Sequence, residues 1–188
     1  MKQKDLRRSR TLSLDVRSNR IGYAVFEHET LLEAGITRFT TSCVATPRLI
    51  FLMRRFHPRV VVLRKISKTS SRNCLTARTI LRAAERIAKR FSLRVAFVSE
   101  QQIRTRFAKE SATTKYQIAS LLIRIFSALA WRLPPPRKAW EGEHRNMAIF
   151  DAVALGMAYL STKSKASKAA ANDPEIQAEF CRRSLGDE

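Results

Sequence analysis

The chain has 188 residues, with 36 lysines and arginines against 16 aspartates and glutamates, which gives a formal net charge of +20 at pH 7. This length suits one domain, and a hydrophobic content of 45% is enough to bury a core, so an overall disordered chain is excluded. No apolar run reaches the roughly 18 residues of a membrane span and none follows the charged start as in a signal peptide, so we expect a cytoplasmic protein without a membrane partner.

The first part of the chain predicts three strands joined by short turns. Residues 11–16 and 21–27 are separated by the turn-like RSNR, and a third apolar run at 31–39 follows the short connection EHET. A helix is expected over 47–57, with Pro47 in its first turn.

The rest of the chain alternates between strands and helices. The runs RVVVLRKI at 59–66 and LRVAFVS at 93–99 predict strands buried on both faces, with a long helix at 70–91 between them. An apolar helix at 113–133 is stopped by three prolines, and a last buried helix covers 146–161.

This order of elements predicts an α/β fold of the ribonuclease-H-like type. Its mixed five-stranded sheet has three antiparallel strands and then two parallel ones, with helices on both faces. The domain is expected to span 11–161, after a basic arm at 1–10 and before a mobile tail at 162–188 that holds few large apolar residues.

The positive charge is concentrated in the middle of the chain. Residues 37–140 hold 23 basic and three acidic residues, whereas the two ends cancel. Such a concentration on a folded domain is the footprint of a polyanion binder, although a merely solubilising surface is the alternative. Because the basic residues are spread over strands, loops and helices, nucleic acid is favoured over a membrane surface as the partner.

Three acidic residues stand where a solvated role is least natural. Asp15 lies at the end of the first strand, Glu100 follows the strand at 93–99, and Asp151 lies in a nearly all-apolar helix. A buried carboxylate needs a partner, and three that converge above a sheet repel one another unless cations neutralise them. Mg²⁺ or Mn²⁺ takes such oxygen ligands, and a pair of these ions supports phosphodiester hydrolysis.

Each of these acids also has an ordinary structural explanation. Asp15 is a residue type that caps turns, and Glu100 suits the first turn of a short helix, EQQIRTRF. Asp151 is able to pair with one of the many arginines. The three together favour a shared site.

Four segments resemble the RuvC-like nucleases, three of them the YqgF branch of that family and one the RuvC-type resolvases. LSLDVRSNRIGYAV (12–25) resembles that branch's opening, in which a strand ends in Asp-Val-Gly and is followed by Arg-Ile-Gly and a second strand. LRVAFVSEQQIRT (93–105) is similar to its strand ending in Asp-Glu-Arg, and FDAVALGMAYL (150–160) to its final helix. SATTKYQIASLL (111–122) resembles the lysine-bearing segment of RuvC-type resolvases.

The resemblance implies a Mg²⁺-dependent or Mn²⁺-dependent endonuclease acting on structured DNA or RNA. The substrate is a Holliday junction in one branch and a ribosomal RNA precursor in the other. On this reading Asp15, Glu100 and Asp151 are catalytic metal ligands, and Lys115 contacts the phosphate or the transition state.

The sequence departs from the family at several positions. Arg17 replaces the glycine after Asp-Val, and Arg64 and Lys65 stand where RuvC-type members carry an acid. A second acid of that pattern, three residues before Asp151, is an alanine here. Glu143 and His144, about two helical turns before Asp151, are candidate substitute ligands.

Two hypotheses therefore remain open. In the first the chain is a metal-dependent nuclease, and in the second it is a catalytically inactive pseudo-nuclease in which Arg17, Arg64 and Lys65 neutralise the carboxylates. An actin-like ATPase is disfavoured by only five glycines. The apolar stretch at 121–133 is either core or a homodimer face. The residues expected to bind nucleic acid are Arg17, Arg20, Arg64, Lys65, Lys68, Arg72 and Arg104.

Overall fold

The computed structural model describes residues 10–65, 74–136, 138 and 140–171. Five strands form one sheet in the order β3-β2-β1-β4-β5. β1 pairs antiparallel with β2 and parallel with β4, and β2–β3 and β4–β5 repeat these two pairings. The predicted ribonuclease-H-like sheet is thereby confirmed. The strands are β1 (Arg10–Val16), β2 (Arg20–Glu27), β3 (Thr30–Arg38), β4 (Val60–Arg64) and β5 (Arg94–Val98).

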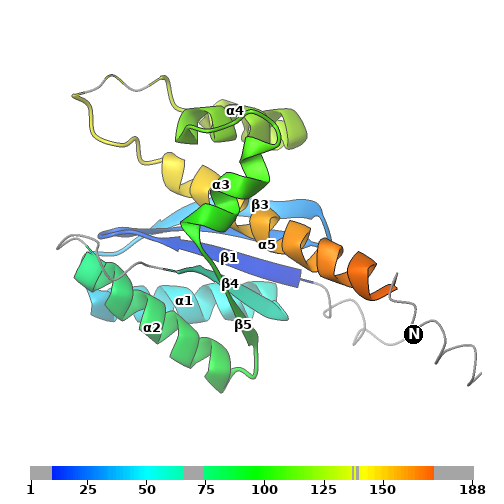
Figure 1. The fold of residues 1–188 in the computed structure, drawn as a ribbon. Helices are drawn as coiled ribbons and strands as arrows, with labels where there is room; N and C mark the ends of the chain where they lie inside the picture. Colours follow the sequence, from blue (N-terminus) through cyan, green and yellow to red (C-terminus); the bar gives the residue numbers. More distant parts are fainter. Residues whose placement is uncertain (1–9, 66–73, 137, 139, 172–188) are drawn as a thin grey trace, which may run out of the picture.

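Helices cover both faces of this sheet (Figure 1). α1 and α2 pack on one face over an apolar core, and α5 packs on the other, where α3 and α4 lie beyond it. Within the described part of the chain, no helix combines the length and hydrophobicity needed to cross a bilayer. The helices are α1 (Ser42–Phe56), α2 (Cys74–Arg90), α3 (Glu100–Ala108), α4 (Lys115–Ile125), a 3-10 helix η2 (Ser127–Arg132) and α5 (Met147–Ala171).

Three boundaries differ from the sequence predictions. α1 begins at Ser42, so Pro47 lies inside it rather than in its first turn. The apolar helix expected at 113–133 is divided at Phe126, where non-helical backbone ends α4 and the ring packs edge-on against Phe26. α5 continues to Ala171, past the predicted boundary at 161.

Within the stretch proposed as a dimer face, Leu122 and Leu129 are buried in the core. Ile125 and Trp131 are exposed. Core packing thus accounts for part of its apolar character, and the homodimer stays a prediction.

Successive side chains of β1 point to opposite faces of the sheet, and this decides which of them reach α5. Leu12 and Leu14 point into the core under α1 and α2, so Ser13 and Asp15 point to the opposite face. There the Ser13 hydroxyl donates to the Ala152 carbonyl at 2.7 Å. This bond fastens α5 across the end of β1.

Gly22 on β2 allows α5 to approach the sheet closely. A Cβ atom built on Gly22 would lie 1.9 Å from the carbonyl oxygen of Ala148, so any larger residue would push the helix away. Gly22 is the β2 partner of Asp15. The close approach therefore places the first turns of α5, and with them Asp151, beside the Asp15 carboxylate.

Candidate functional site

The candidate site lies where β1 and β4 end and α5 begins, at the left-hand end of the sheet in Figure 1. β1 and β4 are parallel neighbours, so their carboxyl ends meet at one edge. Asp15 comes from β1 and Arg64 from β4, while Asp151 lies in α5. Carboxyl ends of parallel strands are a common place for ligand sites in such sheets.

Asp15 and Asp151 are the two buried acidic residues of the described part of the chain, with 3% and 8% of their surface exposed. Glu143, in the loop before α5, is a third carboxylate at the same place and is partly buried. Removing three like charges from water is unfavourable unless cations compensate them. Of the three acids expected to converge, the structure brings together Asp15 and Asp151, and Glu143 rather than Glu100 lies beside them.

The compensating cation at the centre is the guanidinium of Arg17. Its Nε donates to Asp15 Oδ2 at 2.8 Å, while Nη1 donates to Glu143 Oε2 and Nη2 to Asp151 Oδ2. One guanidinium therefore contacts all three carboxylates, each through a different nitrogen. The planar fork of arginine suits such a contact, which the point charge of a lysine cannot reproduce.

Arg64 and Lys115 complete the neutralisation. Arg64 Nε lies 3.0 Å from Asp15 Oδ1 as an ion pair without hydrogen-bond alignment, and its Nη2 lies 3.9 Å from Asp151 Oδ1. Lys115 Nζ donates to Glu143 Oε1 at 2.7 Å and lies 3.5 Å from Asp151 Oδ2. Three cations thus face three carboxylates, and we call this set of six residues the carboxylate centre.

The position of Lys115 is set by the start of α4. The Thr114 side chain accepts from the backbone N–H of Gln117, and the Gln117 side chain accepts from the backbone N–H of Thr114. This capping box fixes the first turn of the helix, whose first residue is Lys115.

The electrostatic balance of the centre is visible in three pKa values. Burial acts to lower the pKa of Arg17, but the nearby Asp15 and Asp151 charges and the hydrogen bonds of Glu143 and Asp15 outweigh it, so this pKa is raised. Burial acts to raise the pKa of Glu143, but Lys115 and Arg17 lower it below its ordinary value. Asp151 keeps a raised pKa because burial and the neighbouring Asp15 outweigh its cations.

These residues do not fit a resident divalent metal ion. Every oxygen of the three carboxylates already faces a nitrogen of Arg17, Arg64 or Lys115. Mg²⁺ or Mn²⁺ needs free oxygen ligands, and its charge would be placed against a cluster that is already neutral. Among the described residues, no group of three His, Cys, Asp or Glu is arranged to hold a metal ion.

The structure does not bring Glu100 into the carboxylate centre. Its carboxylate is exposed and accepts from Arg104 Nη2 at 2.6 Å, one helical turn along α3. Ser99 and Gln102 form a capping box that starts α3 directly after β5, and Glu100 is the acid in its first turn. This is the ordinary structural explanation offered by the sequence, and it fits the stabilisation of acids at helix N-termini. His144 accepts from the Asn146 N–H, and among the described residues it makes no hydrogen bond or ion pair with the centre.

The predicted nucleic-acid-binding residues are placed differently from one another. Arg17 and Arg64 are in the carboxylate centre, and Arg104 is paired with Glu100. Arg20 begins β2, and Lys65 is exposed beyond the end of β4. Lys68 and Arg72 lie outside the described residues.

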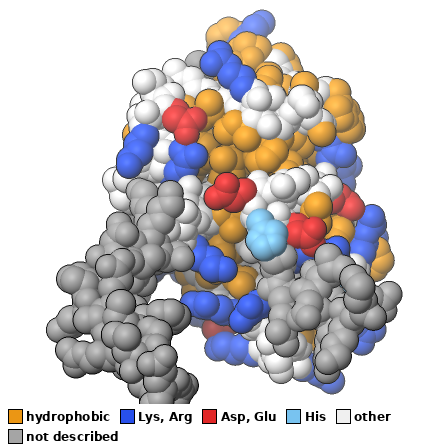
Figure 2. Space-filling view, turned by 90° about the vertical axis from the view of Figure 1, so that its right-hand side faces the viewer, with side chains coloured by type: hydrophobic (Ala, Val, Ile, Leu, Met, Phe, Trp, Pro, Cys, Tyr) orange, Lys and Arg blue, Asp and Glu red, His pale blue; other side chains and the backbone are white. Residues whose placement is uncertain are grey.

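Sequence reasoning missed Arg38 and Arg145, two exposed arginines at the same end of the sheet. Arg38 ends β3 directly opposite Arg20, and Arg145 stands just before α5. Neither has an ion pair within the described ranges. The opposite end of the molecule, seen in Figure 2, shows side chains of both signs. The pairing register of the second hairpin is the signal that would have placed Arg38 beside Arg20.

The fold is that of RuvC-type Holliday junction resolvases. RuvC of Thermus thermophilus superposes with a TM-score of 0.63 at 16% sequence identity, covering 83% of this chain and 96% of that protein. The same protein in complex with a Holliday junction substrate gives 0.60 at 15% identity, with the same coverage. Ydc2, the yeast mitochondrial Holliday junction resolvase, gives 0.58 at 12% identity over 81% of this chain and 78% of Ydc2. No protein-family model matches the sequence, and no curated protein does either.

Proposed function

We propose that this chain binds structured nucleic acid, foremost branched DNA, and that it is a pseudo-nuclease whose carboxylate centre is neutralised by its own side chains. The single observation that carries the proposal is Arg17, which contacts Asp15, Glu143 and Asp151 at once. The RuvC-type fold supports the choice of substrate, since its structural neighbours include a resolvase in complex with a Holliday junction.

The charge distribution gives the binding its physical basis. Inside the centre the cations and carboxylates cancel, so the centre itself attracts a phosphate backbone weakly. Around it, the exposed Arg38 and Arg145 keep their charge available, on a chain whose net charge is +20. Affinity is then dominated by phosphate contacts, which release counter-ions and weaken steeply as salt rises.

The second candidate is a Mg²⁺-dependent or Mn²⁺-dependent endonuclease of the RuvC or YqgF type. It is favoured by the adjacency of Asp15 and Asp151, both contacted by Arg17 and Arg64. A metal ion would reach all of these oxygens only after both Arg17 and Arg64 had left the two carboxylates. Breaking buried ion pairs is costly, because it leaves charges without partners. The pseudo-nuclease is therefore the better-supported function.

The test is a binding and cleavage assay on matched substrates. A four-way DNA junction, a linear duplex with the same arm sequence and an RNA duplex are incubated with the full chain, in Mg²⁺, Mn²⁺ or a chelator. We expect a mobility shift in all three buffers, strongest on the junction, with no cleavage products. Metal-dependent cleavage that Asp15→Asn abolishes would instead establish the endonuclease.

A further inference from the structure

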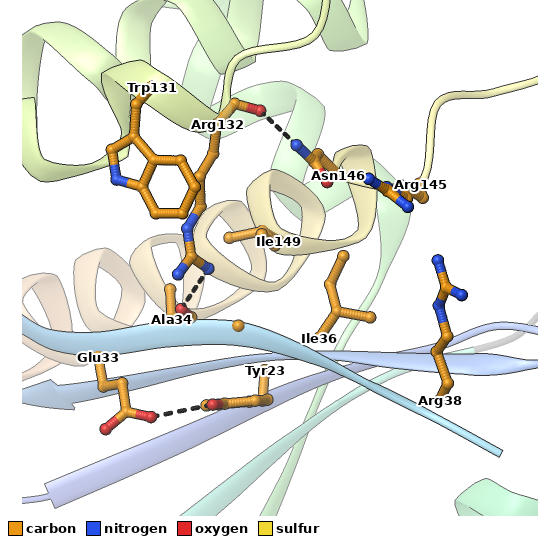
Figure 3. Close-up of a pocket in the computed structure, with 11 residues that line it drawn as sticks. Tyr23, Glu33, Ala34, Ile36, Arg38, Trp131, Arg132, Arg145, Asn146 and Ile149 are labelled. Atoms are coloured by element: carbon orange, nitrogen blue, oxygen red, sulfur yellow. Dashed lines mark hydrogen bonds between the residues drawn. The ribbon is translucent and has the colours of Figure 1, made fainter.

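A second feature of this end of the molecule is a cavity of about 600 Å³ beside the edge strand β3 (Figure 3). Its lining comes from β3, from the 3-10 helix η2 and from the residues that lead into α5. A volume of this size lies within the range of small-molecule and nucleotide sites. We call it the Trp131 pocket.

The pocket is built by hydrogen bonds between its three elements. Arg132 on η2 donates to the carbonyl of Ala34 on β3 at 2.8 Å. Asn146, just before α5, donates from its side chain to the carbonyl of Arg132 at 3.0 Å. η2 is thus tied both to the sheet edge and to the start of α5, so the pocket is preformed.

The two sides of the pocket differ in chemistry. Trp131 and Arg132 lie on one side, with the Arg132 guanidinium 4.4 Å from the indole centroid. The indole is nevertheless 77% exposed, which is unusual for a large aromatic side chain. Arg38 and Arg145 lie on the other side, and the aliphatic side chains of Ile36 and Ile149 lie between (Figure 3).

Among the described residues that line the pocket, three are arginines (Arg38, Arg132 and Arg145) and one is an acid, Glu33. Arg38 stands directly opposite Arg20 in the antiparallel pair, and like charges in such positions repel each other. Glu33, at the other end of the lining, is engaged by Tyr23 and Arg55. An anion bound by Arg38 would offset this repulsion.

A flat aromatic surface on one side and two exposed arginines on the other match the two parts of a nucleotide. A base stacks on tryptophan whatever its sequence, and arginine is the preferred partner of phosphate. A paired base in a duplex cannot enter a side pocket, so the nucleotide has to be unpaired. We propose that the Trp131 pocket binds an unpaired nucleotide of a branched nucleic acid, with the base against Trp131 and its phosphate between Arg38 and Arg145. This inference rests on the proposed function, because it names a subsite for that substrate.

The test compares a forked duplex, which carries unpaired nucleotides at its branch, with a blunt duplex of the same sequence. Dissociation constants are measured for the full chain by fluorescence anisotropy, with 2-aminopurine at the first unpaired position to report stacking. We expect Trp131→Ala to weaken binding of the fork about tenfold and to leave blunt-duplex binding unchanged. Trp131→Phe should recover most of the loss, which a misfolded variant would not do.

Two matched controls separate the pocket from general electrostatics. Trp140→Ala removes the other exposed tryptophan, which also has a cation over its ring but does not line the pocket. Arg48→Ala/Arg94→Ala removes the same charge as Arg38→Ala/Arg145→Ala from places outside the pocket. We expect the pocket pair to lower the preference for the fork and the control pair to leave that preference unchanged.

The outcomes also distinguish this inference from the proposed function. Equal effects of Trp131→Ala and Trp140→Ala on the fork, with duplex and junction binding intact, would overturn the pocket and leave the nucleic-acid binder standing. Failure of the wild-type chain to bind any of the nucleic acids would overturn both.

Discussion

The carboxylate centre and the Trp131 pocket lie at the same end of one sheet, and both rely on arginine, but the arginines face different partners. In the centre, Arg17 and Arg64 lie against buried carboxylates. In the pocket, Arg38 and Arg145 are exposed and lie near an open cavity. Burial decides the difference, since a carboxylate removed from water requires a cation whereas an exposed arginine does not. The charges of the centre are neutralised by one another, whereas the arginines of the pocket are exposed to a ligand.

The largest expected effect is on stability, when one arginine of each region is replaced separately by alanine. Arg17→Ala should lower the free energy of unfolding by about 3 kcal/mol, because it removes the one cation that contacts Asp15, Glu143 and Asp151 together and leaves Arg64 and Lys115 to compensate them. Arg38→Ala should change it by less than about 0.5 kcal/mol, as is usual at exposed positions. Urea unfolding measures both. Equal destabilisation by the two variants would remove the distinction between the regions.

The next prediction asks whether Arg17 occupies the place of a metal ion. In Arg17→Gly, Mn²⁺ at roughly ten times its Kd should raise the Tm by about 3–5 °C, because two acids regain a cation. The wild-type Tm should not respond to Mn²⁺. Adding Asp15→Asn to Arg17→Gly is the control and should abolish the shift. A wild-type shift as large as that of Arg17→Gly would show that the centre accepts a metal with Arg17 in place.

A smaller effect is expected in acid, from Glu143. Although burial acts to raise the pKa of this carboxyl, Lys115 and Arg17 hold it below the ordinary 4.5. Its contribution to stability is present above 4.5 and is lost as the pH falls through the lower, folded-state pKa. Glu143→Gln should therefore flatten the loss of stability as the pH falls below 4.5. Urea unfolding across this range measures it, with Glu110→Gln, at the surface ion pair with Arg106, as the control. An identical acid profile in wild type and Glu143→Gln would contradict the prediction.

The smallest effect concerns the salt dependence of nucleic-acid binding. Arg38→Ala should reduce the slope of log K against log salt concentration by about 0.9, the value of one phosphate contact. Arg48→Ala, on α1 across the sheet, removes the same charge and should leave the slope unchanged. Equal changes in the two slopes would mean that binding uses net charge rather than this end of the molecule.

The fold was predictable because its signals are local and strong. Continuous β-branched runs indicated the buried parallel strands, and the short turns at RSNR and EHET indicated the antiparallel hairpins. The convergence of Asp15 and Asp151 followed from the same pattern, since one is at a strand end and the other in an apolar helix. The end of α4 at Phe126 could not be predicted in this way, because Phe126 packs there against Phe26, which lies on a strand far away in the sequence.

Glu100 shows where the sequence prediction of the site reached its limit. An acid directly after a strand has the same sequence signature as an acid in the first turn of the following helix. Ser99 and Gln102, the capping box that distinguishes the two, were both present in the sequence and favour the helix. The contact of Arg17 with three carboxylates could not be predicted from the sequence, because it depends on how the loop that carries Glu143 returns to the end of β1.

The cation in the middle of the carboxylate centre, the guanidinium of Arg17, is covalently attached to the chain two residues from Asp15. A bound metal ion obeys mass action, so its occupancy depends on supply and is erased by chelators. A guanidinium on the same backbone does not dissociate, and its concentration at the site does not depend on the surroundings. The neutral state of the centre is therefore constitutive, and the charge at this end of the sheet is the same whether divalent cations are abundant or scarce.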